Sequence, residues 1–155
     1  MSTQALSEQG LAAWVAFIRG HATLIRSLNA QLVSDHGLTI NDYEVLLRLS
    51  RAPERRLKRV ELAQSVLLTP SGITRLLDGL EASGWVEKAA CESDARVTYA
   101  VLTEQGLAKL HAAAQSHLED VDRVFAAHFE TEELEALASL LSRLGAGEVD
   151  ECRPG

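Results

Sequence analysis

The sequence lacks the local patterns that identify most enzymes and metal proteins. Its 155 residues contain no Gly-rich phosphate loop, no G-x-S-x-G turn, no H-E-x-x-H helix and no carboxylates clustered at one strand end. It has two cysteines, Cys91 and Cys152, without partnered His or Cys spacing, and its five histidines are scattered. We therefore expect no catalytic activity, no metal site and no cofactor.

Long apolar runs are also missing. No stretch is apolar for the roughly 18 residues that a membrane span needs. The N-terminus lacks the charged start and apolar core of a secretory signal. With 46% hydrophobic residues and no repeats, the chain is still able to bury a core. We expect residues 1–155 to form a single domain in the cytoplasm, without membrane contact.

A short helix with clear borders is predicted after residue 69. Thr69 suits the N-cap, Pro70 the first helical position, and Gly84 a left-handed turn that closes the helix. The apolar positions have helical spacing and are Ile73, Leu76, Leu77 and Leu80. The opposite face carries Ser71, Thr74, Arg75 and Asp78. Hydroxyls and a guanidinium can bond phosphates and base edges in the major groove, although an ordinary amphipathic surface helix has the same pattern.

Two runs of β-formers follow the helix, at residues 85–90 and 97–102, with a polar connection at 91–96. They predict a two-stranded hairpin. Its tip would hold Arg96 away from the body, where a long cation can enter a narrow minor groove, and Asp94 can hold that guanidinium in place. The alternative is an exposed turn with an incidental ion pair worth about 1 kcal/mol or less.

Positive charge is concentrated in the middle of an acidic chain. Residues 48–59 contain six Lys and Arg, among them Lys58, a candidate for contact with DNA. Residues 48–96 hold nine basic and seven acidic residues, whereas the remainder holds six and fifteen, for a net charge of −7. Phosphate contact depends on such a local patch rather than on the overall charge, but a solvated loop would have the same composition.

Residues 38–106 resemble the MarR family of bacterial transcriptional regulators. The most specific parts are the helical segment ELAQSVLLTPSGITRLLDGLEASGWV, the tip Ser93-Asp94-Ala95-Arg96 in place of the family's D-x-R, and Val101-Leu102-Thr103. The resemblance implies a homodimeric winged helix-turn-helix protein. Such a protein binds double-stranded DNA at a pseudo-palindromic operator, usually represses, and dissociates when a small molecule binds.

The resemblance also assigns roles to residues at matching positions. Ser71, Thr74 and Arg75 would lie in the major groove, and Arg96, braced by Asp94, in the minor groove. Many family members carry a further cation at the tip, in the pattern D-x-R-R. Here Ala95 and Val97 flank a single Arg, so the affinity of the wing would depend mostly on Arg96.

The two ends of the chain are predicted to be dimerisation helices, at residues 5–35 and 104–145. The first has a heptad-like seam of Leu11, Trp14, Ile18, His21, Ile25, Leu28 and Leu32. The second consists of one helix at 104–129 and a final helix, with Thr103 and Thr131 as N-caps. A monomer whose end helices pack only on each other remains an alternative, because periodicity does not say whose helix fills a seam.

The expected fold is mainly α with a small β-hairpin wing, in the order α-α-α-α-β-β-α-α. Residues 40–103 would form the winged helix-turn-helix lobe. Its first helix would begin near Asn41, with a capping box to Glu44, and end at the pre-proline Ala52. A short helix near 59–66 and a minor third strand near Leu57 complete the lobe.

The resemblance further implies a small aromatic acid effector, bound between the dimerisation helices and the lobe. The candidate side chains are Trp14, Arg19, His21, Arg26, Asp42 and Tyr43. An anion needs a cation and a ring benefits from a stacking surface. His21 interrupts the apolar seam, but a core histidine with a backbone partner would do the same.

Two other mechanisms are compatible with the sequence. Oxidation of Cys91, at the base of the hairpin, would give a thiol-responsive regulator. A winged helix used only for protein contact would make the chain an adaptor. The polar face with Ser71, Thr74 and Arg75 favours DNA over an adaptor, which would present an apolar face.

Overall fold

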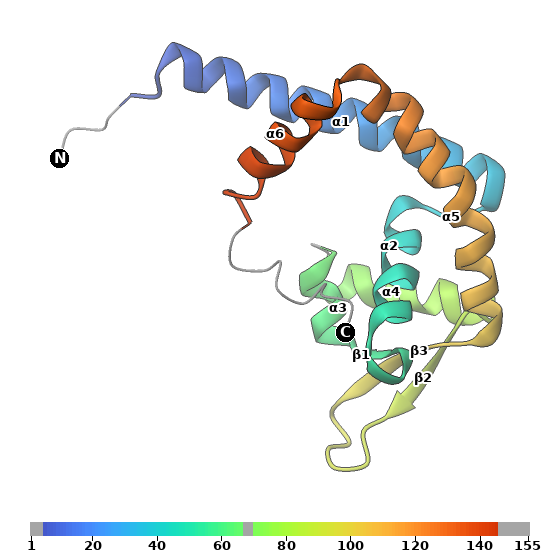
Figure 1. Ribbon diagram of the computed structural model, residues 1–155. Coiled ribbons are helices and arrows are strands. Elements are labelled where there is room, and N and C mark those ends of the chain that lie inside the picture. Colours follow the sequence, from blue (N-terminus) through green and yellow to red (C-terminus); the bar gives the residue numbers. More distant parts are fainter. Residues whose placement is uncertain (1–4, 67–69, 146–155) are drawn as a thin grey trace.

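The chain is mainly helical, with a three-stranded antiparallel sheet in the order β1-β3-β2 (Figure 1). The computed structural model describes residues 5–66 and 70–145. The first half contains α1 (Glu8–His36), α2 (Ile40–Arg51), the 3₁₀ turn η1 (Pro53–Arg55), β1 (Arg56–Lys58) and α3 (Arg59–Ser65). The second half contains α4 (Pro70–Ala82), β2 (Val86–Ala90), β3 (Thr98–Leu102), α5 (Glu104–Val124), the 3₁₀ turn η2 (Ala126–His128) and α6 (Thr131–Leu141). The predicted winged-helix fold class is confirmed, including the minor strand near Leu57.

Helix α2 begins one residue before the position predicted from the sequence. Thr39 is its N-cap and forms the capping box with Asp42, through Asp42 N–H to Thr39 Oγ1 at 3.1 Å and Thr39 N–H to Asp42 Oδ2 at 2.9 Å. The predicted Asn41–Glu44 box was therefore wrong. Thr39–Asp42 and Asn41–Glu44 have the same capping-box spacing. Gly37, with φ 67°, ends α1 two residues before Thr39, and the earlier of the two boxes forms.

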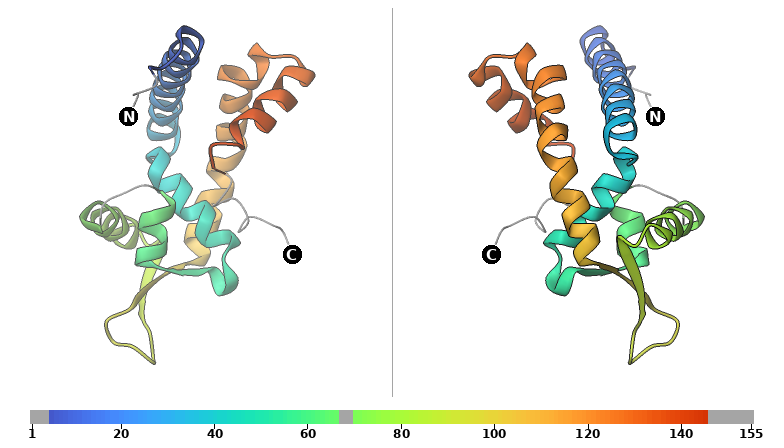
Figure 2. Two further views of the ribbon diagram at one scale, coloured as in Figure 1. Left: turned by 90° about the vertical axis from the view of Figure 1, so that its left-hand side faces the viewer. Right: turned by 90° about the vertical axis from the view of Figure 1, so that its right-hand side faces the viewer.

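The end of α4 and the hairpin follow the sequence prediction closely. Gly84 has φ 80°, and the Trp85 N–H donates to the Leu80 carbonyl at 3.0 Å, which closes the helix. The hairpin strands pair from Val86↔Leu102 to Ala90↔Thr98. Figure 2 shows this hairpin projecting from the body of the molecule. The predicted N-cap Thr69 lies outside the described residues.

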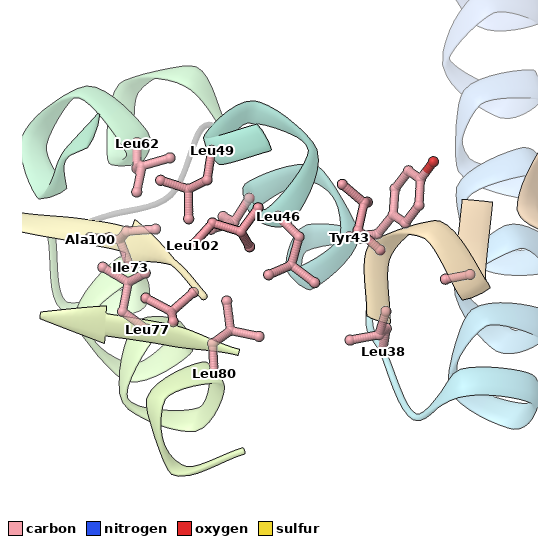
Figure 3. Close-up of a cluster of buried hydrophobic side chains, with 14 of the residues drawn as sticks. Leu38, Tyr43, Leu46, Leu49, Leu62, Ile73, Leu77, Leu80, Ala100 and Leu102 are labelled. Atoms are coloured by element: carbon pink, nitrogen blue, oxygen red, sulfur yellow. The ribbon is translucent and has the colours of Figure 1, made fainter. Parts of the chain in front are cut away.

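The core lies between α2, α3, α4 and the sheet (Figure 3). Helix α4 turns its predicted apolar face into it, so its polar face is left outside. Alternation along β3 likewise buries Ala100 and Leu102. The principal core side chains are Leu46, Leu49, Leu62, Ile73, Leu77, Leu80, Val86, Ala100 and Leu102.

The root of the hairpin is fixed on α5 by a close backbone approach. A Cβ on Gly106 would meet the Trp85 carbonyl oxygen at 2.0 Å, so only glycine fits there. Thr103 caps α5 as predicted: its Oγ1 accepts from the Gly106 N–H at 3.0 Å and donates to the Gly84 carbonyl at 2.7 Å. These contacts join the end of α4, the sheet and α5 into one unit.

The C-terminal helices depart from the prediction in two places. Helix α5 ends at Val124 instead of continuing to residue 129, because the backbone at Phe125 leaves the helical region and η2 follows. The rings of Phe125 and Phe129 pack 5.4 Å apart across this turn. Helix α6 is capped by Glu130, whose capping box with Glu133 displaces the predicted cap Thr131. Within the described residues, no helix has the length and apolar character needed to cross a membrane.

Candidate nucleic-acid interface

The outward face of α4 presents the polar side chains that the sequence placed there. Ser71, Thr74, Arg75 and Asp78 line one open depression of the surface. Ser71 and Arg75 are exposed, and Thr74 is half-buried. The side chains on this face therefore include two hydroxyls and a guanidinium, which are groups that carry hydrogen-bond donors.

Neighbouring elements hold two of these four side chains. Arg59, at the start of α3, donates from Nη1 to Thr74 Oγ1 at 3.3 Å. Lys88, on β2, contacts Asp78 Oδ1 at 2.5 Å and Glu81 Oε2 at 3.1 Å. Hydrogen bonds to Asp78 and then Glu81 raise the pKa of Lys88. The acidic member of the face is thus tied to the hairpin, a contact that the sequence did not indicate.

The tip of the hairpin has the ion pair that the sequence suggested. Asp94 Oδ1 accepts from the backbone N–H of Arg96 at 3.0 Å and from its Nε at 3.2 Å. These two bonds lower the pKa of the Asp94 carboxyl. The Arg96 side chain is 91% exposed, so it projects into solvent with its base held near the tip.

Two further residues named from the sequence lie in the same region. Lys58 is exposed at the end of β1, directly opposite Tyr99 of β3. Cys91 lies at the base of the tip with its Sγ 3.2 Å from Ser93 Oγ. Hydrogen bonds from Ser93, first from its side chain, lower the pKa of this thiol.

The effector candidates do not converge on one place within the chain. Trp14, Arg19, His21 and Arg26 are exposed on α1. Asp42 is used by the capping box, and Tyr43 is buried. Helix α1 meets the start of α2 at Asn29, whose Oδ1 accepts a hydrogen bond from the Ile40 N–H at 2.9 Å. Trp14 lies about 22 Å further along α1 at 1.5 Å per residue, well away from Tyr43.

One buried histidine, His117, is not among the site residues predicted from the sequence. It is 8% exposed, its ring packs 4.4 Å from that of Tyr43, and its Nδ1 has no hydrogen-bond partner among the described residues. Burial lowers its pKa, whereas Glu44 and then Asp120 act in the opposite direction. Its spacing from Leu110 and Ala113 places it on the apolar face of α5. This helical spacing is the feature of the sequence from which its burial could have been predicted. No group of three or more metal-binding side chains occurs among the described residues.

Comparison with known proteins agrees with this geometry. A family model described as "MarR family" matches residues 36–97. AbsC, a MarR family transcriptional regulator from Streptomyces coelicolor, is 30% identical, with a TM-score of 0.83 over 93% of this chain and 97% of that one. The chain belongs to the MarR family. This membership in a family of transcriptional regulators agrees with the expectation that the chain is not an enzyme.

Two further relatives extend the comparison. The MarR family regulator Sco3205 of Streptomyces coelicolor, solved in complex with DNA, is 28% identical, with a TM-score of 0.87 over 97% of this chain and 94% of that one. The HTH-type transcriptional regulator MhqR of Bacillus subtilis is 26% identical over 140 residues, which are 90% of this chain and 94% of that protein. The MarR-family similarity therefore covers the end helices as well as the lobe.

Proposed function

We propose that this MarR-family chain is a homodimeric, sequence-specific DNA-binding regulator, acting as a repressor that a small aromatic acid releases from a pseudo-palindromic operator. The observation that supports it best is the outward face of α4 with its exposed Arg75, accompanied by the 91% exposed Arg96 on the hairpin. A fold close to that of Sco3205, which was solved with DNA, adds support.

The proposed contacts divide into two groups. Ser71, Thr74 and Arg75 lie in the major groove, with Arg75 bonded to a guanine edge. Arg96, braced by Asp94, enters the adjacent minor groove. Lys58 contacts a phosphate, and Thr69, which lies outside the described residues, is the remaining proposed DNA contact.

The proposed dimer uses the apolar side chains that α1, α5 and α6 leave exposed. They include Leu11, Trp14, Phe17, Ile18, Leu118, Leu140 and Leu141. A second copy would cover them, and the twofold axis would match the symmetry of a palindromic site. If the end helices of a monomer packed on each other instead, these apolar side chains would be buried between them rather than exposed.

The DNA proposal is tested by titrating the DNA upstream of the protein's own gene at two salt concentrations. Phosphate contacts release counterions, so affinity falls steeply as salt rises. Arg75→Ala should cost about 1–3 kcal/mol and relax one base preference. Arg96→Ala should weaken binding with less effect on major-groove preference. Arg143→Ala, beyond α6, is the matched control, and unchanged binding by both test variants would refute this orientation.

The effector proposal rests on the cations and rings along α1 and on the junction of α1 and α2. The exposed candidates Trp14, Arg19, His21 and Arg26 would complete a site only with the second copy, whereas Asp42 and Tyr43 lie at the junction. A panel of phenolic and benzoic acids should include one that raises the melting temperature and weakens the operator complex. The proposal would be refuted if no acid of the panel raised the melting temperature or weakened the operator complex.

A thiol-responsive mechanism is the second candidate, favoured by the hydrogen bonds that lower the pKa of Cys91. A lower pKa increases the thiolate fraction, and the thiolate is the form that peroxide attacks. Peroxide should then abolish DNA binding by the wild type and spare Cys91→Ser. Equal loss in the two proteins would exclude it.

A further inference from the structure

A second, more enclosed crevice lies between α4 and the hairpin. It has a volume of about 260 Å³ and is lined by Arg59, Thr74, Leu77, Lys88, Thr98, Tyr99 and Ala100. These residues supply two cations and three hydroxyl groups over an apolar floor, and none of the described lining residues is a carboxylate. The lining is thus rich in hydrogen-bond donors, a composition suited to an anion.

The position of the crevice follows from the two DNA contacts under Proposed function, on which this inference rests. If α4 enters the major groove and the hairpin the adjacent minor groove, one strand of the duplex must pass between them. The backbone of that strand separates the two grooves. We propose that the crevice seats one backbone phosphate of this strand, with Arg59 as its principal cation.

The charges of the lining single out Arg59. Its hydrogen bond goes to the Thr74 hydroxyl, which leaves its positive charge uncancelled at that contact. Lys88 is engaged by two carboxylates, Asp78 and Glu81, which offset its charge. A phosphate between α4 and the hairpin therefore gains most from the guanidinium, which is also able to donate two hydrogen bonds to it.

The crevice is lined by residues of the sheet and of helices α3 and α4 rather than by loops. Tyr99 pairs with Lys58 on one side and with Ala89 on the other, so its backbone is fixed by both neighbouring strands. The guanidinium carbon of Arg56 lies 5.3 Å from the centre of the Tyr99 ring. The volume is below the roughly 300–1,000 Å³ usual for organic ligands, which favours a phosphate group over an effector.

The test replaces phosphates of one operator half-site, one at a time, with uncharged methylphosphonates. Wild-type protein should lose affinity at the phosphate between the two grooves. Arg59→Met should bind unmodified operator about ten- to a hundredfold more weakly and become insensitive to that one replacement. Its salt slope should fall by about one phosphate contact, with unchanged base preference. Arg143→Met, exposed beyond α6 and outside both the crevice and the basic segment 48–59, is the control.

Two results would overturn the proposal. The first is a methylphosphonate profile of Arg59→Met identical to that of the wild type, with melting temperatures showing both proteins folded. The second is an Arg59-dependent rise in melting temperature with inorganic phosphate at equal ionic strength, combined with unchanged profiles, which would assign the crevice to a free anion. A wild-type protein that bound no DNA would instead refute the proposed function.

Discussion

The lobe of residues 40–103 buries most of its large apolar side chains, whereas the two ends of the chain leave many of theirs exposed. Leu46, Leu49 and Leu62 in the lobe are all 0% exposed, whereas Trp14 of α1 is 57% exposed. None of the eleven residues of α6, all of them described, is buried. The lobe thus buries most of its large hydrophobic side chains within one chain, with Val60 as an exposed exception, while the ends leave many of theirs exposed.

The change from one behaviour to the other takes place along α1 itself. Its C-terminal half packs on α5 and buries Leu28 and Leu32, but its N-terminal half exposes Leu11 and Ile18 on the same seam. The same heptad-like pattern is therefore buried in the C-terminal half of α1 and exposed in its N-terminal half. The stability of the lobe and the proposed association of two chains should therefore be separable properties, and four experiments examine the two regions.

The largest effect is expected in the core of the lobe. Leu46→Ala should lower the free energy of unfolding by about 2–5 kcal/mol, because it removes buried methyl groups and leaves a cavity. Urea denaturation measures the change. Leu140→Ala, half exposed on α6, is the control and should change the unfolding of the lobe far less. Equal losses would show that both regions depend on the same packing.

A charge on the exposed seam should act on association instead. Ile18→Asp places a carboxylate where the second copy is proposed to pack, and should weaken dimerisation at least about tenfold, or about 1.4 kcal/mol. Sedimentation equilibrium over a range of protein concentrations measures the dissociation constant. Thr23→Asp, on the opposite side of α1, is the charge-matched control. An unchanged mass for Ile18→Asp would place the interface elsewhere.

The connection between the regions depends on Thr103. Thr103→Val removes the hydroxyl that caps α5 and bonds the Gly84 carbonyl, and should cost about 0.5–2 kcal/mol. Thermal unfolding measures the loss. Thr131→Val is the control, because Glu130 rather than Thr131 caps α6. If both substitutions cost the same, the hydroxyl of Thr103 has no special role.

The smallest effect concerns His117, which lies where α5 meets α2. Its pKa in the folded chain is below the ordinary 6.5 because burial disfavours imidazolium. The unfolded chain therefore binds more protons in this range. The stability from neutral His117 is complete above about pH 6.5 and is lost as the pH falls through the lower folded pKa. His117→Phe should flatten the pH dependence of unfolding over this range.

Exposed His111, on the same helix, supplies the control for that measurement. His111→Phe should leave the pH dependence as in the wild type. A slope for His117→Phe equal to that of the wild type would show that another group titrates in this range.

The parts of the site that could be predicted are those with local signals. The helical spacing of Ile73, Leu77 and Leu80 indicated which face of α4 is buried, and so indicated that Arg75 faces outward. The ion pair of Asp94 and Arg96 spans two residues and needs no tertiary contact. By contrast, the bond from Arg59 to Thr74 joins α3 to α4, and no spacing rule in the sequence indicates such a contact.

The sequence by itself determined the order of elements, the polar face of α4 and the cation at the hairpin tip, because periodicity, caps and turn residues act over a few positions. Tertiary structure decided the rest. It ended α5 at Val124 and buried His117 against Tyr43. It also formed the crevice beside α4 from residues 59–100. These outcomes depend on which distant surfaces meet, and local physical chemistry does not fix that.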